Sequence, residues 1–337
     1  MLTFAENGWL PDTPEELAEL RRYQVSFDSF SSGDWVREHG LYPQTKYNVP
    51  PEISWESFKP ELQRRKAHFD DLRNKGWCLW WWEIARAHGL PMNRVLHANQ
   101  LQYTSCAGYS AAMTYSRKVI YQMLTAPIRW DAINPMPMWA ITKNYSTQGG
   151  SSMASVRIGG AKYGNYAVDD PGIGEYPGRV DRSAYEKAAP YAQSRQLCSC
   201  TIPANVEAVQ LCLDALEVVA IGNYTACKTC RLDSNGILIG VLAGNWAHAT
   251  TLDSIRYVRG TPYFHWSNSW GDMYKGCKEN SPMTGCWLTK DQMAQMLKNA
   301  NAWCTVYAEA YNLFDGRQPD FAPRFVPHPD YVLHRHS

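Results

Sequence analysis

The feature that most constrains the fold is a change of hydrophobic period after residue 216. Before it, apolar residues recur at helical spacing, most clearly over 203–216 and from 105 to about 124. After it, short apolar or alternating runs separated by turns predict strands. These strands are expected at 218–221, 237–242, 248–257, 263–267 and 303–311, with one helix between the last two, over 289–299. Helices first and an antiparallel sheet second predict an α+β fold with two lobes.

The first hundred residues predict helices joined by loops. A capping pattern predicts a helix over 13–23, and a second helix is expected over 55–74, after a loop at 26–53. Four tryptophans between residues 77 and 82 predict a helix wedged between layers of the core, because aromatic side chains bury much apolar area. Residues 126–200 are rich in Pro and Gly and predict loops with short helices.

Composition and motif content exclude several classes of function. Lys and Arg number 33 against 32 Asp and Glu, so no charge field attracts nucleic acid or an anionic membrane. No apolar run approaches the roughly 18–20 residues of a membrane span. The start of the chain does not resemble a secretory signal, so we expect a cytoplasmic location, or a particle assembled there, and ten reduced cysteines. The motifs of zinc peptidases, serine hydrolases, phosphate loops and dinucleotide folds are absent.

One constellation has the chemistry of nucleophilic catalysis. Cys106 opens an apolar helix, where the helix dipole is expected to lower the thiol pKa. The side-chain amide of Gln100 and the backbone N–H of Cys106 would form an oxyanion hole. His248 on one expected strand and Asn268 at the end of the next would hydrogen-bond, which fixes the imidazole tautomer. Trp270 would shield that hydrogen bond from water.

Taken in order, these residues resemble the signatures of the papain-like cysteine peptidases. The signatures are a Gln followed after five residues by a Cys, a His before a small residue in a strand, and Asn-Ser-Trp-Gly. This chain has Gln100 and Cys106, then His248, then Asn268-Ser269-Trp270-Gly271. The resemblance covers roughly residues 90–311.

The resemblance implies a fold with a helical lobe and an antiparallel, barrel-like sheet lobe. A peptidase domain would span 90–312, with the helical lobe at about 100–200 and the sheet lobe at about 201–312. Residues 1–89 would be a mostly helical N-terminal extension and residues 313–337 a tail. The extension lacks the helical pattern of the family's inhibitory propeptide, so we expect it to cover the domain or to dock a partner.

The resemblance also implies a role for each signature residue. Cys106 would be the nucleophile, and His248 the base that forms an ion pair with it and later protonates the leaving amine. Asn268 would orient His248, and Gln100 would donate to the oxyanion. The implied substrate is a peptide or protein, and no cofactor is expected.

A glycine pair marks the expected substrate cleft. Gly149-Gly150 lies where the family has the glycines that line this cleft. There Gly150 would offer its backbone to an extended peptide in antiparallel pairing.

Two departures from the family change the surroundings of the nucleophile. Ala107 replaces a common Trp, and Tyr103 replaces the Cys of a nearby disulfide.

The same residues are compatible with two other functions. The chain would also fit a catalytically inactive structural or peptide-binding module, for example a component of a virion or another assembly. An acyltransferase is the other alternative, because water and an amine attack the same thioester. Sequence alone does not separate these functions.

A second group of cysteines raises the question of a metal site. The pairs are Cys198 with Cys200 and Cys227 with Cys230. A helix over 203–216 and a returning strand of similar length would bring the two pairs close together, and four thiolates would suit structural zinc. Their spacing is looser than that of a zinc ribbon, so we expect free thiols and no metal.

Overall fold

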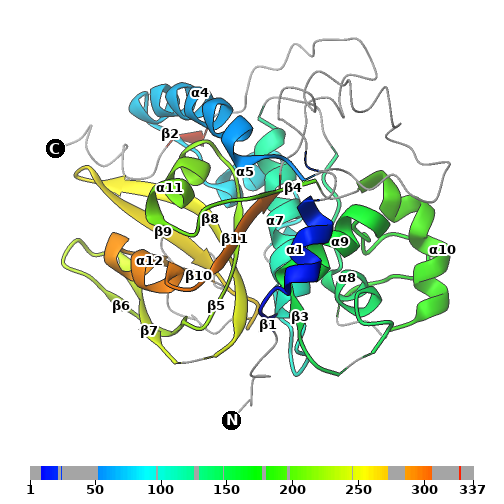
Figure 1. Ribbon diagram of the computed structural model, residues 1–337. Coiled ribbons are helices and arrows are strands. Elements are labelled where there is room, and N and C mark those ends of the chain that lie inside the picture. The colour runs from blue at the N-terminus through cyan, green and yellow to red at the C-terminus, as the bar shows by residue number, and fades with distance from the viewer. Residues whose placement is uncertain are drawn as a thin grey trace.

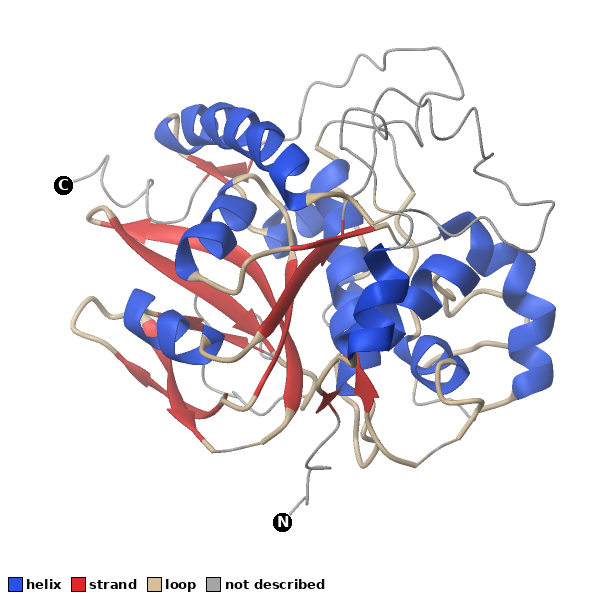
Figure 2. Ribbon diagram, viewed as in Figure 1, coloured by secondary structure: helices blue, strands red, loops and turns tan. Residues whose placement is uncertain are grey.

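The computed structural model describes residues 9–21, 24, 52–95, 98–124, 129–146, 148–176, 180–195, 198–244, 246–271, 285–305 and 326–327. Several helices gather on one side of the molecule, and on the other lies a twisted sheet that is flanked by further helices (Figures 1 and 2). The predicted α+β class with two lobes is therefore confirmed. Within these described residues, no helix combines the length and the apolar character needed to cross a membrane.

An eight-stranded sheet forms one side of the molecule, in the order β4-β11-β5-β8-β9-β10-β7-β6. Its strands are β4 (Ser199–Thr201), β5 (Val219–Asn223), β6 (Ala226–Leu232), β7 (Leu238–Ala243), β8 (His248–Val258), β9 (Thr261–Ser267), β10 (Gly285–Leu288) and β11 (Asn301–Thr305). Every neighbouring pair is antiparallel except β10 with β7. The five predicted strands are confirmed, although residues 306–311 of the last one lie outside the described chain.

The helices are α1 (Pro14–Arg21), α4 (Trp55–Asn74), α5 (Trp81–Ala87), α6 (Met92–Val95), α7 (Cys106–Gln122), α8 (Pro135–Ile141), α9 (Met153–Tyr163), α10 (Arg182–Ala192), α11 (Val206–Asp214) and α12 (Lys290–Leu297). The helix predicted over 55–74 has these bounds in the structure. The one expected from residue 203 begins later, because Asn205 accepts a hydrogen bond from the Ala208 N–H and caps α11. Short strands β1 (Trp9–Leu10), β2 (Trp77–Cys78), β3 (Ser151–Ser152) and β12 (Val326–Pro327) complete the described elements.

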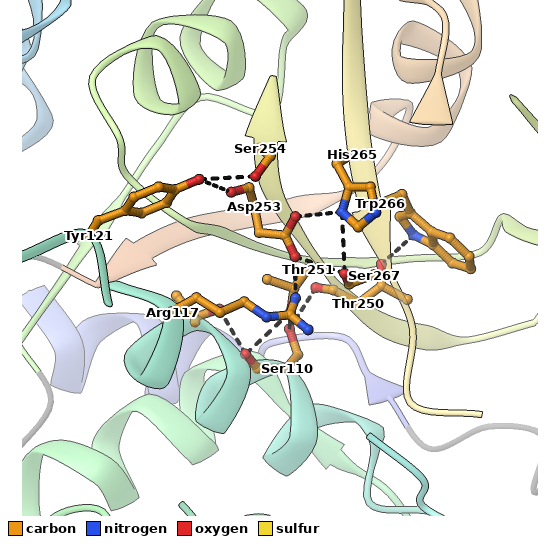
Figure 3. A network of polar contacts seen from close by, with 11 residues as sticks. Ser110, Arg117, Tyr121, Thr250, Thr251, Asp253, Ser254, His265, Trp266 and Ser267 are labelled. Carbon is orange, nitrogen blue, oxygen red and sulfur yellow. Dashed lines mark hydrogen bonds and ion pairs between the residues drawn. The ribbon is translucent and has the colours of Figure 1, made fainter. Parts of the chain in front are cut away.

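Helix α7 runs between the two sides of the molecule, and polar side chains join it to β8 and β9 (Figure 3). Buried Asp253 forms an ion pair with Arg117 of α7. The same carboxylate accepts hydrogen bonds from His265 Nδ1 at 2.6 Å and from Ser267 Oγ at 2.7 Å. Burial alone would raise the pKa of Asp253, but Arg117 and His265 hold it below its ordinary value. The carboxylate therefore stays ionised and fixes α7 against the sheet.

Residues 52–95 contribute side chains to the cores beneath and beside the sheet. The Ile53 N–H donates to the Ser199 carbonyl at 2.8 Å, at the edge strand β4. Phe58 and Leu62 of α4 are fully buried in one hydrophobic cluster with strand residues. The predicted burial of the tryptophans is confirmed for Trp80–Trp82, which share a second cluster with Trp287.

The lobe and extension boundaries expected from the sequence stay predictions. The loop expected at 26–53 lies outside the described residues except for its last two. Of the expected tail, 313–337, only Val326 and Pro327 are described, and they pair with β2.

Candidate active site

The site forms where the first turn of α7 meets the start of β8. Cys106 is the first residue of α7, and its Sγ accepts a hydrogen bond from the Ala249 N–H at 3.4 Å. One turn further along α7, Ser110 Oγ donates to the Thr250 carbonyl at 2.6 Å. Because His248 directly precedes Ala249 on β8, the register of these contacts places the backbone of His248 next to the residue that binds the thiol.

The imidazole of His248 has a fixed tautomer and a fixed plane. Its Nε2 lies 2.7 Å from Asn268 Oδ1, which also accepts the Ser269 N–H at 2.7 Å. An amide oxygen only accepts, so Nε2 carries the proton and Nδ1 of the neutral ring has the free lone pair. The indole of Trp270 stacks on the ring with centroids 4.5 Å apart and planes inclined by 22°.

The amide of Gln100 is also held in one orientation. Ser269 Oγ donates to Gln100 Oε1 at 2.5 Å, and Gln100 Nε2 donates to the Tyr103 carbonyl at 2.9 Å. The backbone N–H of Gln100 donates to the Ser269 carbonyl at 2.7 Å. The amide nitrogen carries two hydrogens, and within the described parts of the chain only one of them is used, which leaves the other N–H for a ligand.

The glycine that ends the Asn-Ser-Trp-Gly motif allows two segments to approach closely. The Gly271 N–H donates to the Ala98 carbonyl at 2.9 Å, and Gly271 has φ +64°. A Cβ there would lie 2.9 Å from Asn99 Nδ2. Both the backbone angle and the contact require glycine, and the pairing carries Gln100 toward Asn268.

Burial determines which protonation states Cys106 and His248 favour. Cys106, Gln100 and Asn268 are fully buried, and His248 is 2% exposed. Burial raises the pKa of the Cys106 thiol to about 12, although the N–H groups of Ala249 and Ala107 oppose this. Burial lowers the pKa of His248 to about 4, and its bond to Asn268 opposes that. The expectation of a lowered thiol pKa is wrong in this buried state, because desolvation outweighs the helix dipole.

The two glycines expected to line the substrate cleft, Gly149 and Gly150, directly precede β3. Hydrogen bonds from two side chains fix the Gly149 carbonyl. Gly149, at φ +74°, has a carbonyl that accepts hydrogen bonds from Thr104 Oγ1 and Lys143 Nζ, each at 2.5 Å. Partial burial lowers the pKa of Lys143 to about 8. The antiparallel pairing expected at Gly150 stays a prediction. The backbone pairing that the structure does have is one residue further on, at Ser151, and it is parallel.

Comparison with known proteins gives distant structural likenesses only. No protein-family model matches the chain, and no curated protein matches its sequence. Xylellain, a cysteine protease from Xylella fastidiosa, is 12% identical over 62% of this chain and 81% of its own, with a TM-score of 0.45. Digestive procathepsin L 3 of Tenebrio molitor larval midgut is 12% identical over 84% and 100%, with a TM-score of 0.44. The bromelain protease of Ananas comosus is 13% identical over 62% and 92%, with a TM-score of 0.43.

Sequence reasoning missed two residues of the site. Ser269 orients the Gln100 amide through its hydroxyl group. Because Ser269 lies within the same Asn-Ser-Trp-Gly motif as Asn268, the motif itself could have indicated this role. Trp246 packs edge-to-face on Trp270, with centroids 5.9 Å apart, two residues before His248. A second indole so close to the histidine was visible in the sequence as well.

The two cysteine pairs do not come together. Cys200 lies on β4 with Cys198 just before it, whereas Cys227 and Cys230 lie on β6, at the opposite edge of the sheet. The expected proximity is wrong because the strand that follows α11 is the inner strand β5, and the second pair lies one strand further along the chain. Among the described residues, no group of three or more metal-ligating side chains is placed to hold a metal ion.

Proposed function

We propose that this protein is a thiol peptidase of the papain-like family, which hydrolyses peptide bonds through an acyl-enzyme on Cys106. The observation that carries the proposal is the meeting of Cys106 with the start of β8. The sulfur accepts the Ala249 N–H at 3.4 Å, and the adjacent His248 is oriented by Asn268 at 2.7 Å. A nucleophile, a base and an orienting group are the parts that covalent catalysis needs.

The reaction would begin with transfer of the thiol proton to His248 Nδ1, which the tautomer leaves unprotonated. The Cys106 sulfur then bonds to the carbonyl carbon of the substrate. The C–N bond breaks as His248 gives its proton to the leaving amine, and a thioester remains. Water attacks the thioester with His248 as the base, and the acid product leaves as the thiol is restored.

The negative charge on the tetrahedral intermediate would be stabilised by two donors. They are the backbone N–H of Cys106 and the second N–H of Gln100 Nε2. Ser269 and Tyr103 fix the Gln100 amide before the substrate arrives. Donors oriented in advance stabilise the developing charge without the cost of reorganisation.

Covalent labelling tests the proposal. An epoxide-bearing peptide inhibitor of thiol peptidases should give one adduct per chain, located on Cys106 by mass spectrometry. Labelling should be at least about 10²-fold slower in His248→Ala, because the base no longer activates the thiol. His68→Ala, at an exposed histidine of α4, should label like the native chain. Adducts spread over other cysteines, or labelling indifferent to His248, would reject the assignment.

One observation favours a second candidate, a peptide-binding module without turnover. Cys106 and His248 are buried, and burial favours the neutral thiol and the neutral imidazole over the reactive thiolate–imidazolium ion pair. This candidate predicts peptide binding that is unchanged in Cys106→Ala and no hydrolysis by the native chain. Hydrolysis that depends on Cys106 would exclude it.

A further inference from the structure

Three buried thiols meet at the edge of the eight-stranded sheet, outside the candidate active site. Cys200 of β4 and Cys304 of β11 are direct partners across an antiparallel strand pair, and Figure 1 shows the two strands side by side. Cys212 of α11 lies in the same hydrophobic cluster as both. The Cys304 side chain forms hydrogen bonds with those of Cys200 and Cys212. All three residues are fully buried.

The cluster lies on the face of the sheet that points away from the candidate nucleophile. Trp303, the neighbour of Cys304 on β11, shares a hydrophobic cluster with Cys106. Successive side chains of a strand point to opposite faces, so Cys304 points away from that cluster. It lies instead in the cluster that contains α11 residues. The thiols are therefore a second group of sulfur atoms, which the proposed peptidase reaction does not use.

The strand register places Cys200 and Cys304 at the distance that a disulfide spans. The Ile202 N–H donates to the Ala302 carbonyl at 3.1 Å, which identifies these two residues as a hydrogen-bonded pair. Cys200 and Cys304 lie two residues further along each strand, so they occupy a pair of the same kind. The Cα atoms of such a pair are about 5.5 Å apart. A disulfide joins Cα atoms that are roughly 4.4–6.8 Å apart, so the strands need not separate.

The surroundings of the three thiols favour one thiolate beside two protonated thiols. Hydrogen bonds with Cys200 and Cys212 hold the pKa of the Cys304 thiol well below its ordinary value, and the cations of Lys118 and Arg157 act in the same direction against burial. The contact with Cys304 raises the pKa of the Cys200 thiol, and burial raises that of Cys212. A thiolate is the form of cysteine that an oxidant attacks, and a neighbouring thiol can then complete a disulfide.

We propose that Cys304 and Cys200 form a modification site, at which a hydroperoxide converts the two thiols into a disulfide between β11 and β4. The Cys304 sulfur bonds to the terminal oxygen of the peroxide, and the O–O bond breaks. The other oxygen takes the proton that Cys304 gave up and leaves as water or an alcohol, so Cys304 becomes a sulfenic acid. The Cys200 sulfur then bonds to that of Cys304, and the hydroxyl group leaves with the Cys200 proton as water. The two thiols lose two electrons in total, and the peroxide gains them.

The disulfide would fix an edge of the sheet to which the N-terminal part of the chain is attached. Strand β4 ends the sheet and pairs with β11. On its other side, the Ser199 carbonyl accepts the Ile53 N–H at 2.8 Å, and the Thr201 N–H donates to Glu52 Oε1 at 3.0 Å. A bridge from β4 to β11 would therefore hold residues 52–53 to the inner strands as well.

Peroxide treatment of the full-length chain, followed by peptide mapping without reduction, tests the site. Cys106→Ala serves as the parent chain, so that the candidate nucleophile takes no part. We expect one linked peptide pair that joins Cys200 to Cys304 and disappears in dithiothreitol. The unfolding midpoint should rise by about 10 °C on oxidation, because the bridge closes a loop of roughly 100 residues in the unfolded chain.

Substitutions identify the role of each thiol. Cys200→Ala and Cys304→Ala should each abolish the linked peptide and the rise in the midpoint. Cys198→Ala, the matched control at a buried thiol just before β4, should leave both unchanged. When Cys200 and Cys212 are both replaced by Ala, the sulfenic acid on Cys304 should persist and react with dimedone. Midpoints measured in dithiothreitol show that each variant folds.

Two results would overturn the proposal. Cys200 and Cys304 that both stay reduced in peroxide, with an unchanged midpoint, would show that the site is not oxidised. A disulfide from Cys304 to Cys212 or Cys198 would show that Cys200 is not the partner. The linked peptide of the parent chain decides the pairing even if a variant does not fold. Since no step measures peptide cleavage, each result is independent of the proposed peptidase function.

Discussion

Replacing Cys106 by Ala is expected to lower kcat/KM for peptide hydrolysis by about 10⁴-fold or more, because the variant lacks the sulfur on which the proposed acyl intermediate forms. Cys106→Ser should also be nearly inactive, since a hydroxyl gives up its proton far less readily than a thiol. Both variants should keep the native unfolding midpoint within a few degrees. The measurement is steady-state cleavage of a quenched fluorescent peptide library.

His248→Ala should lower kcat/KM about as much as Cys106→Ala does. The double variant should lower kcat/KM no further than either single variant. Residues that act as one unit have non-additive effects, since removing either one stops the same step. His68→Ala is the control, because this histidine is exposed on α4. Additive losses, or hydrolysis retained in Cys106→Ala, would show that the two residues do not share a step.

Deleting residues 1–89 is expected to abolish folding. The deletion removes Phe58, Leu62 and Trp80–Trp82, which are buried against the sheet. Losing a buried aromatic side chain costs about 3–5 kcal/mol, so several losses exceed the roughly 5–15 kcal/mol stability of a typical domain. Arg157 would also lose its partner Glu52, which it contacts at 2.8 Å with both side chains buried.

Circular dichroism and thermal unfolding measure this result. Deleting only residues 1–24 is the control, because it removes β1 and α1 and leaves the buried residues of 52–95 in place. That shorter deletion should keep a cooperative unfolding transition. A cooperative transition in the chain of residues 90–337 would show instead that the N-terminal extension is a separable unit.

The parts of the site that could be predicted from sequence are those that local pattern specifies. Cys106 at the start of an apolar helix, and Asn268 inside a four-residue motif, are recognisable without knowing any long-range contact. The helix over 55–74 was predictable for the same reason, since Ser54 caps it and Lys75-Gly76 ends it. Where residue spacing and caps decide the structure, the prediction was correct.

The features that were missed depend on contacts between distant segments. A two-residue strand such as Trp9–Leu10 has no periodicity, and its partner Ser151–Ser152 lies in the other part of the chain. Strand β6 lacks the alternation of a strand with one buried face, because it is an edge strand that is mostly exposed after Cys227. The direction of the Cys106 pKa shift was predicted from the helix dipole alone, whereas burial raises this pKa.

The proposed peptidase function depends on acylation of Cys106. Rapid mixing of the chain with a peptide nitrophenyl ester, followed by acid quench and mass spectrometry, measures this acylation. We expect a burst of nitrophenol and one acyl group per chain on Cys106, and no acyl group there in His248→Ala. Turnover without acylation of Cys106, or an acyl group on another residue, would contradict it.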